Sequence, residues 1–180
     1  MTTIDHAGAL AVPRPDALSA ERVASRALQV ARRTALGVLG DAEAAADIAQ
    51  DVAITAVRRA GSLRDPAALD AWLHRIAVRA ALREARRSGR RRAAERAGHD
   101  PPGATACDAQ PVAGSLALLD GLPARQRAAL TLRYVHDLTD AEIARALRCR
   151  PGTVRSLLSR GRDAVRAAID HDDRSPDANH

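Results

Sequence analysis

The sequence contains no lysine and no phenylalanine, and it has one tryptophan and one tyrosine among 180 residues. All 28 basic side chains counted as Lys or Arg are therefore arginines. The near absence of aromatic residues argues against a protein that binds single-stranded nucleic acid by stacking bases on aromatic rings. It argues equally against a basic RNA-binding adaptor, because sequence-specific RNA recognition commonly uses the same stacking.

Cysteines and histidines are too few or too poorly spaced to build a covalent or metal framework. Cys107 and Cys149 cannot form a disulfide network or a zinc site of four cysteines. The 6 histidines show no metal-ligand spacing with one another or with the cysteines. Glycine-rich phosphate loops and nucleophile motifs are also missing. We therefore expect no metal, no cofactor and no enzymatic activity.

Long apolar runs are absent as well. No run approaches the roughly 18 residues that a membrane-spanning helix requires. The N-terminus lacks the basic-then-apolar order of a secretory signal. We therefore expect a cytoplasmic protein that does not insert into membranes.

Alanine, leucine and arginine dominate the composition, and all three favour helix. The fold class predicted is all-α. A net charge of +6 and a pI near 10.9 suit a polyanionic partner. Nucleic acid is the first candidate for that partner, and an anionic membrane surface is the second.

Three amphipathic segments predict a first helical domain over residues 18–92. Gly40 ends the first segment, and Asp41 is a suitable N-cap for the second. Asp65 followed by Pro66 is a good start for the third. Apolar residues at helical spacing form the predicted inner face of the domain: Val23, Ala27, Val30, Ala31, Ala35, Val38, Ala45, Ile48, Val52, Leu69, Trp72, Leu73, Ile76 and Ala80.

Polar side chains gather on the opposite faces of the second and third segments. In the second, Asp47, Gln50 and Asp51 point outwards, and on residue pattern alone they could be a solvated helix surface. The third segment shows a basic face that includes His74, Arg75, Arg79 and Arg83. Trp72 lies on the apolar stripe and is expected in the core.

The remaining chain divides into a linker, a second domain and two tails. Residues 1–17 and 170–180 lack periodicity and are predicted to be disordered tails. Residues 93–114 are rich in Gly, Pro and Ala and predict a flexible linker. About twenty residues span at most roughly 70 Å, enough to join DNA sites one or two turns apart. The second domain is predicted over residues 115–169.

A helix-turn-helix is predicted within that second domain. Thr139 precedes Glu142 by three residues, which is the spacing of a capping box. A short connection follows, and Pro151 suits the first position of the next helix. That helix has an apolar stripe and a polar face rich in arginine. This arrangement favours DNA binding in the major groove over a solvated bundle, because several independent signals coincide in order.

The two halves together resemble sigma-70 factors of bacteria, specifically the short extracytoplasmic-function group. The segment LPARQRAALTLRYVHDLTDAEIARALRCRPGTVRSLLSRGRDAVR resembles the fourth conserved region of that family. DAEAAADIAQDV and DPAALDAWLHRIAVRAALREARR resemble parts of the second region. The resemblance covers about residues 20–92 and 116–169. It implies a protein that binds core RNA polymerase and directs promoter-specific initiation.

The resemblance also implies roles for individual residues. Asp47, Gln50 and Asp51 would contact core RNA polymerase. The minus-ten element would lie against His74, Arg75, Arg79 and Arg83. Double-stranded DNA of the minus-thirty-five element would meet the start of the last helix, through Arg150, Thr153, Arg155, Ser156, Ser159 and Arg160. Arg125, Arg127 and Arg133 would hold phosphates. An anti-sigma factor is a further partner that the resemblance implies.

A stand-alone helix-turn-helix regulator is the alternative function. Its first half would form a dimer or sense a ligand, and it would bind a palindrome with half-sites about one turn apart. A sigma factor would instead prefer two unlike elements. Two different basic modules on a long linker favour the sigma factor. The residue pattern is compatible both with two domains that mask each other and with two that move independently.

Overall fold

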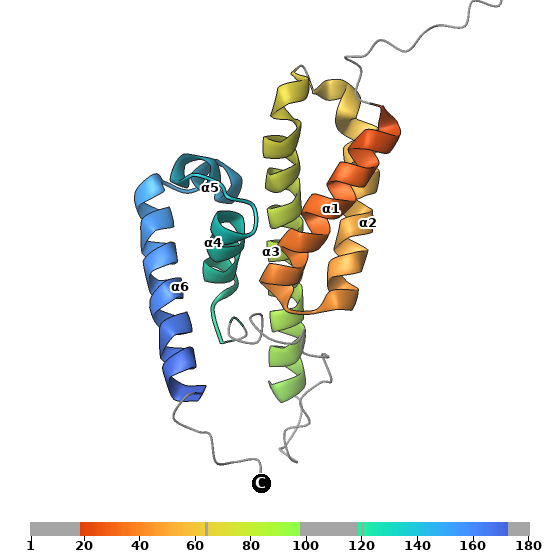
Figure 1. Cartoon of the computed structure of the whole chain (residues 1–180). Helices are drawn as coiled ribbons and strands as arrows, with labels where there is room; N and C mark the ends of the chain where they lie inside the picture. The colour runs from red at the N-terminus through yellow and green to blue at the C-terminus, as the bar shows by residue number, and fades with distance from the viewer. Residues whose placement is uncertain (1–18, 64, 98–118, 120, 173–180) are drawn as a thin grey trace, which may run out of the picture.

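The regular structure of the computed structural model is entirely helical within the residues that it describes, which are 19–63, 65–97, 119 and 121–172. This confirms the all-α prediction. The elements, shown in Figure 1, are α1 (Ala20–Leu39), α2 (Ala42–Arg59), η1 (Ala60–Ser62), η2 (Pro66–Ala68), α3 (Leu69–Ala97), α4 (Ala124–Tyr134), α5 (Asp140–Leu147) and α6 (Pro151–Asp172), where η marks a short 3₁₀ helix.

The helix boundaries in the first half follow local capping. The Ser19 hydroxyl accepts a hydrogen bond from the Arg22 amide, so α1 begins just after it. Gly40 ends α1 in the left-handed conformation, at φ 71°. The Asp41 carboxylate accepts from two amides at the start of α2, and Asp65 does the same for one amide of η2. The predicted caps at Asp41 and Asp65 are confirmed.

Helices α1, α2 and α3 pack around one apolar cluster. Val23 and Ala27 of α1, Val52 of α2 and Leu73 of α3 are buried there. Trp72 is partly buried and packs against the same cluster, on the side that the sequence predicts. Most side chains in this cluster are the small ones of Ala and Val, so the three helices can pack close together.

Helix α3 continues beyond the predicted end of the first domain at residue 92. It runs to Ala97, because the stretch RRRAAERA consists of good helix formers. Helix α6 likewise extends to Asp172, past the predicted limit at residue 169. The tail over 1–17, most of the linker over 93–114 and the part of the C-terminal tail from 173 to 180 lie outside the described residues.

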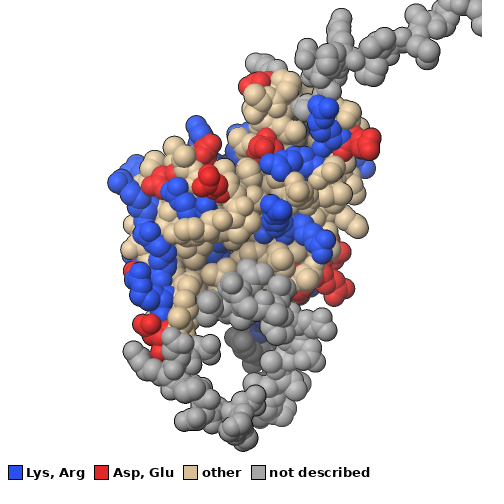
Figure 2. Space-filling model, in the orientation of Figure 1, with Lys and Arg blue, Asp and Glu red and all other residues tan. Residues whose placement is uncertain are grey.

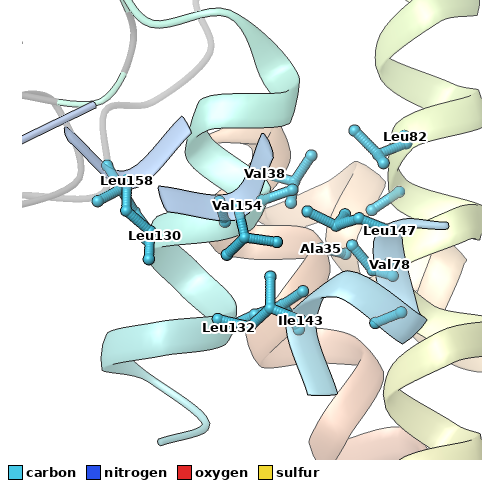
Figure 3. Close-up of a cluster of buried hydrophobic side chains, with 14 of the residues drawn as sticks. Ala35, Val38, Val78, Leu82, Leu130, Leu132, Ile143, Leu147, Val154 and Leu158 are labelled. Atoms are coloured by element: carbon cyan, nitrogen blue, oxygen red, sulfur yellow. The ribbon is translucent and has the colours of Figure 1, made fainter. Parts of the chain in front are cut away.

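The two halves of the chain share a second apolar cluster, drawn in Figure 3. Val38 of α1 and Val78 of α3 meet Leu132 of α4 and Ile143 of α5, and all four are fully buried. We call this contact of α1 and α3 with α4, α5 and the α4–α5 loop the seam. Because its residues come from both predicted domains, the structure is the mutually packed arrangement and not two separate bodies.

Gly37 of α1 and Thr131 of α4 approach each other closely within the seam. A methyl group added to Gly37 would lie 2.3 Å from the Thr131 hydroxyl oxygen and 2.8 Å from its methyl carbon. Both residues are buried. The absence of a side chain at Gly37 therefore allows the two helices to touch.

Truncation of the shared cluster should destabilise the protein. Leu132→Ala removes a side chain that is 0% exposed, and it should lower the free energy of unfolding by about 2–5 kcal/mol. Ile169→Ala on α6, where the side chain is 43% exposed, is the control and should cost much less. Urea denaturation followed by circular dichroism measures both. Equal losses would contradict the assignment of Leu132 to the core.

Candidate nucleic-acid interface

Helix α5, which precedes α6 in the chain, has a capping box at its start. The Thr139 hydroxyl accepts from the Glu142 amide, and the Glu142 carboxylate accepts from the Thr139 amide at 2.8 Å. This confirms the predicted capping box. The hydrogen bonds that the Thr139 hydroxyl and amide donate to this carboxylate lower the pKa of Glu142. Arg148 adopts the left-handed conformation at φ 51° and ends α5, and Pro151 begins α6 two residues after Cys149.

Helix α6 is apolar on one side and polar on the other. Val154 and Leu158 are buried against the shared cluster, and Gly161 lies so close to α4 that an added methyl group would be 3.0 Å from Leu130. The residues predicted to meet the minus-thirty-five element are all exposed: Arg150, Thr153, Arg155, Ser156, Ser159 and Arg160. Arginine side chains follow α6 along one edge of the surface in Figure 2.

The two arginines at the centre of this face keep their donors available. Among the described residues, neither Arg155 nor Arg160 has an ion-pair partner. The Ser156 hydroxyl donates back to the Gly152 carbonyl at 3.1 Å. A guanidinium with free donors on an exposed helix face is suited to bind guanine O6 and N7 in a major groove. The geometry therefore fits duplex DNA.

The arginines expected to hold phosphates have partners inside the protein. Arg125 donates to the Leu147 carbonyl at the end of α5, at 3.3 Å. Arg133 forms an ion pair with Asp140, and Arg127 reaches the Leu119 carbonyl at 3.5 Å. These contacts brace α4 against its neighbours, which is a role that residue type alone does not reveal.

The acidic face of α2 is as the sequence predicts. Asp47, Gln50 and Asp51 are all exposed and follow one side of the helix, at three- and four-residue spacing. No ion pair with another described residue holds either carboxylate. Figure 1 shows α2 and α6 on opposite sides of the molecule, so the acidic face and the basic face of α6 are well separated.

The basic face of α3 is only partly exposed. Arg75 and Arg83 are exposed, whereas Arg79 is half-buried. Burial, together with the charges of Arg148, Arg75 and Arg83, lowers the pKa of Arg79. His74 does not have the exposed position that the sequence predicts.

The second half of the chain covers His74, which is 6% exposed. Its ring packs edge-on against the ring of His136, with centroids 4.6 Å apart. His136, from the α4–α5 loop, also lies 2.9 Å from the Thr34 hydroxyl of α1. Helical periodicity treats each half of the chain separately, so it predicts neither the Thr34–His136 contact nor the burial of His74.

Burial favours the neutral form of both imidazoles. It lowers the pKa of His136 to about 4, and the neighbouring His74 and Arg33 add to this effect. The pKa of His74 is also lowered, mainly by burial, although the nearby Asp70 partly opposes the shift. Asp70 forms an ion pair with Arg26 at 2.8 Å, which lowers the pKa of that carboxyl.

A cleft of about 640 Å³ opens beside the two histidines. Its walls come from α1, η2, α3, the α4–α5 loop and α5, and they carry both signs of charge.

Among the described residues, no group of three or more His, Cys, Asp or Glu side chains is placed to hold a metal ion. Nor is any helix in this part of the chain long and apolar enough to cross a membrane.

Comparison with known proteins links each half of the chain to a conserved region. Residues 21–91 match the model of sigma-70 region 2, and residues 116–165 match the model of sigma-70 region 4. The RNA polymerase sigma-H factor of Pseudomonas aeruginosa is 34% identical over 153 residues, which cover 72% of this chain and 75% of that protein.

Two further similarities agree with these matches. The ECF RNA polymerase sigma factor SigM of Mycobacterium tuberculosis is 35% identical over 130 residues, covering 67% of this chain and 61% of that protein. The structure resembles that of the sigma factor RpoE of Bartonella quintana, solved in complex with the anti-sigma factor NepR. That similarity has a TM-score of 0.62 and 25% identity, and covers 80% of this chain and 92% of that one.

The buried histidines should make stability depend on pH. Since their folded pKa values lie below the ordinary value near 6.5, the unfolded chain binds protons that the folded chain excludes. The free energy of unfolding should therefore fall as the pH is lowered from about 6.5 towards 4. Urea denaturation across this range tests the expectation.

His136→Gln should flatten that pH profile, because glutamine does not titrate. His171→Gln, at an exposed position on α6, is the matched control and should leave the profile unchanged. Arg26, Arg33, Asp70 and Glu142 also contribute charge around the two rings and stay in place in both variants. An unchanged profile in His136→Gln would contradict the expectation.

Proposed function

The chain belongs to the extracytoplasmic-function group of the sigma-70 family, and we propose that it uses three separate helix faces for core RNA polymerase and promoter DNA. It is a sigma factor, which binds core polymerase and directs transcription initiation. Members of this family are initiation factors and not enzymes. The proposed roles concern the individual faces, and they include no catalytic activity of the chain itself.

The observation that carries the proposal is the separation of an exposed acidic face on α2 from an exposed basic face on α6. One chain can therefore hold a protein partner and DNA at the same time. Asp47, Gln50 and Asp51 on α2 contact core polymerase. The carboxylates of Asp47 and Asp51 are exposed and form no ion pair within the described part of the chain, so they are available to a basic surface.

Helix α6 binds the minus-thirty-five element as duplex DNA. Arg155 and Arg160 read base edges, while Arg150, Thr153, Ser156 and Ser159 contact bases or phosphates at the start of the helix. The buried side of α6 is fixed by Val154 and Leu158, which orient this face outwards. On α3, Arg75 and Arg83 meet the minus-ten element, together with His74 and Arg79 once these two are accessible.

The predicted division of the chain supports this assignment of faces. Residues 18–92 form the unit for polymerase and the minus-ten element, and residues 115–169 form the unit for the minus-thirty-five element. The similar RpoE structure pairs a sigma factor with an anti-sigma factor, and we include such a protein among the partners of this chain. The site of action is the cytoplasm, where bacterial RNA polymerase works.

A stand-alone dimeric regulator is not favoured. That alternative offers no account of the acidic face of α2. It also gives no reason for the first half of the chain to match sigma-70 region 2 over residues 21–91.

Reversing the charge of the α2 face should weaken polymerase binding. The Asp47→Arg, Asp51→Arg double variant replaces two carboxylates with two guanidinium groups, which a basic partner surface repels. Affinity should fall by about tenfold or more. Binding to purified core polymerase, measured by pull-down or fluorescence titration, tests this.

The matched control is Glu21→Arg, Asp170→Arg, which changes the net charge equally at exposed positions of α1 and α6. It should bind polymerase like the unmodified chain. If both double variants bind equally, the α2 face is not the polymerase contact. If the unmodified folded chain fails to bind polymerase, the whole assignment is wrong.

Removal of one arginine from α6 should affect DNA recognition alone. Arg160→Ala should reduce promoter-specific transcription by about tenfold, since a bidentate contact to guanine contributes roughly 1–3 kcal/mol. Polymerase binding should remain intact. Arg32→Ala on α1 is the matched control, because this exposed arginine is assigned no contact with DNA or polymerase. Loss of polymerase binding in Arg160→Ala would indicate a structural role.

A further inference from the structure

The cleft beside His74 and His136 has the size and the walls of a small-molecule site. Its volume of about 640 Å³ lies within the roughly 300–1,000 Å³ that is usual for pockets of small ligands. Val30, Val135 and Leu138 contribute apolar walls, and the side chain of Val135 is 48% exposed. A ligand with an apolar body would remove this surface from water, which stabilises the bound state.

The charged walls of the cleft carry an excess of positive charge. Arg26 and Asp70 neutralise each other as an ion pair. Three further arginines and two further carboxylates line the cleft: Arg33, Arg75, Arg145, Asp137 and Glu142. None of these three guanidinium groups forms an ion pair within the described part of the chain. Free guanidinium groups bind carboxylates well, so the cleft favours an organic anion.

The tautomer of His136 places a hydrogen-bond acceptor on the wall of the cleft. The Thr34 hydroxyl has one hydrogen, which it donates to the Val30 carbonyl at 2.8 Å. Its oxygen also lies 2.9 Å from Nε2 of His136, so it accepts a hydrogen bond from that nitrogen. Nε2 therefore carries the proton of the neutral ring, and Nδ1 is left as an acceptor.

Nδ1 of His136 is available to a ligand. It is not buried, and it has no hydrogen-bond partner among the residues that the structure describes. Burial lowers the pKa of His136 to about 4, and the charges of His74 and Arg33 add to this effect. The ring is therefore neutral at pH 7, and Nδ1 requires a ligand that donates an N–H or an O–H.

Arg33 and His136 bring the charged contact and the acceptor together. The charge of Arg33 acts on the His136 ring, so the two side chains are close. His74 packs edge-on against the same ring, with centroids 4.6 Å apart, and restricts its orientation. A ligand that meets both groups at once carries its donor on the carbon next to its carboxylate.

We propose that the cleft binds a small α-amino or α-hydroxy carboxylic acid with an apolar side chain. Its carboxylate lies against Arg33, and its N–H or O–H donates to Nδ1 of His136. Its side chain covers the exposed surface of Val135. The inference goes beyond the proposed function and does not rest on it, because Arg33 and His136 have no assigned contact with DNA or polymerase.

A matched series of compounds tests the ligand chemistry on the full chain. L-phenylalanine has all three features, L-3-phenyllactate replaces the amine with a hydroxyl, 3-phenylpropionate lacks the donor and phenethylamine lacks the carboxylate. Titrations followed by ligand-observed NMR at pH 7 measure their dissociation constants. Loss of the donor or of the carboxylate should weaken binding by about fivefold or more, as for the loss of one hydrogen bond.

The same series separates the two kinds of acid. Saturable binding of phenylalanine alone identifies an amino acid, that of phenyllactate alone a hydroxy acid, and that of both the shared chemistry. If neither binds saturably, or if 3-phenylpropionate binds as well as the better of the two, the inference is wrong.

Removal of Arg33 should weaken the binding of the better acid. Arg33→Ala takes away one charged contact and should raise the dissociation constant by about tenfold. Arg32→Ala is the matched control, because it removes an exposed arginine at the preceding position of α1 that does not line the cleft. It should bind like the unmodified chain. Equal dissociation constants for the two variants would contradict the inference.

The tautomer of His136 can be tested before any ligand is added. A long-range ¹H–¹⁵N correlation spectrum at pH 7 should show the proton on Nε2 and none on Nδ1. The Nδ1 shift should then move on titration with the better acid, while the exposed His171 serves as the internal reference. A proton on Nδ1, or an Nδ1 shift that stays constant at saturation, would overturn the inference.

A second variant leaves every charge in place. Ala71 is exposed and lines the cleft, so the indole of Ala71→Trp should occupy the ligand's space without disturbing the core. Saturable binding should be lost, and unchanged binding would place the ligand elsewhere. Polymerase binding keeps this inference apart from the proposed function. Arg33→Ala should bind polymerase normally, and a parallel loss of polymerase and acid binding would make Arg33 a structural residue.

Discussion

The close approach of α1 to α4 at Gly37 is the contact on which the arrangement of the two halves depends. Because Gly37 has no side chain, Thr131 lies directly against the backbone of α1. At this distance Thr34 reaches His136, and Val38 reaches the apolar side chains of α4 and α5. The burial of His74 follows from the same arrangement. A wider separation at this one point would leave each of these groups facing water.

Features set by neighbouring residues could be predicted from the sequence. The caps at Asp41 and Thr139 and the proline at the start of α6 need only a few adjacent side chains, so their sequence pattern is specific. The exposed faces of α2 and α6 follow from helical periodicity in the same way.

The seam could not be derived so directly, because it joins residues far apart in the chain. One signal was present: Val78 and Leu82 form an apolar stripe on α3 beside the stripe of Leu69, Leu73 and Ala80. A helix that is apolar on more than one side packs between two partners. Arginines such as Arg125 gave no comparable signal, since the same residue type can donate to a carbonyl or to a phosphate.

The hydrogen-bonding contact between Thr34 and His136 links positions 102 residues apart. Contacts of such separation form late in folding, because closing a long loop costs entropy that local helix contacts do not. During synthesis the N-terminal helices leave the ribosome first and fold as a unit. A newly made chain consequently passes through a stage in which α3 is complete and the residues that cover it are not yet translated. During synthesis, α3 is therefore exposed before the second half of the chain is made, and it becomes covered only afterwards.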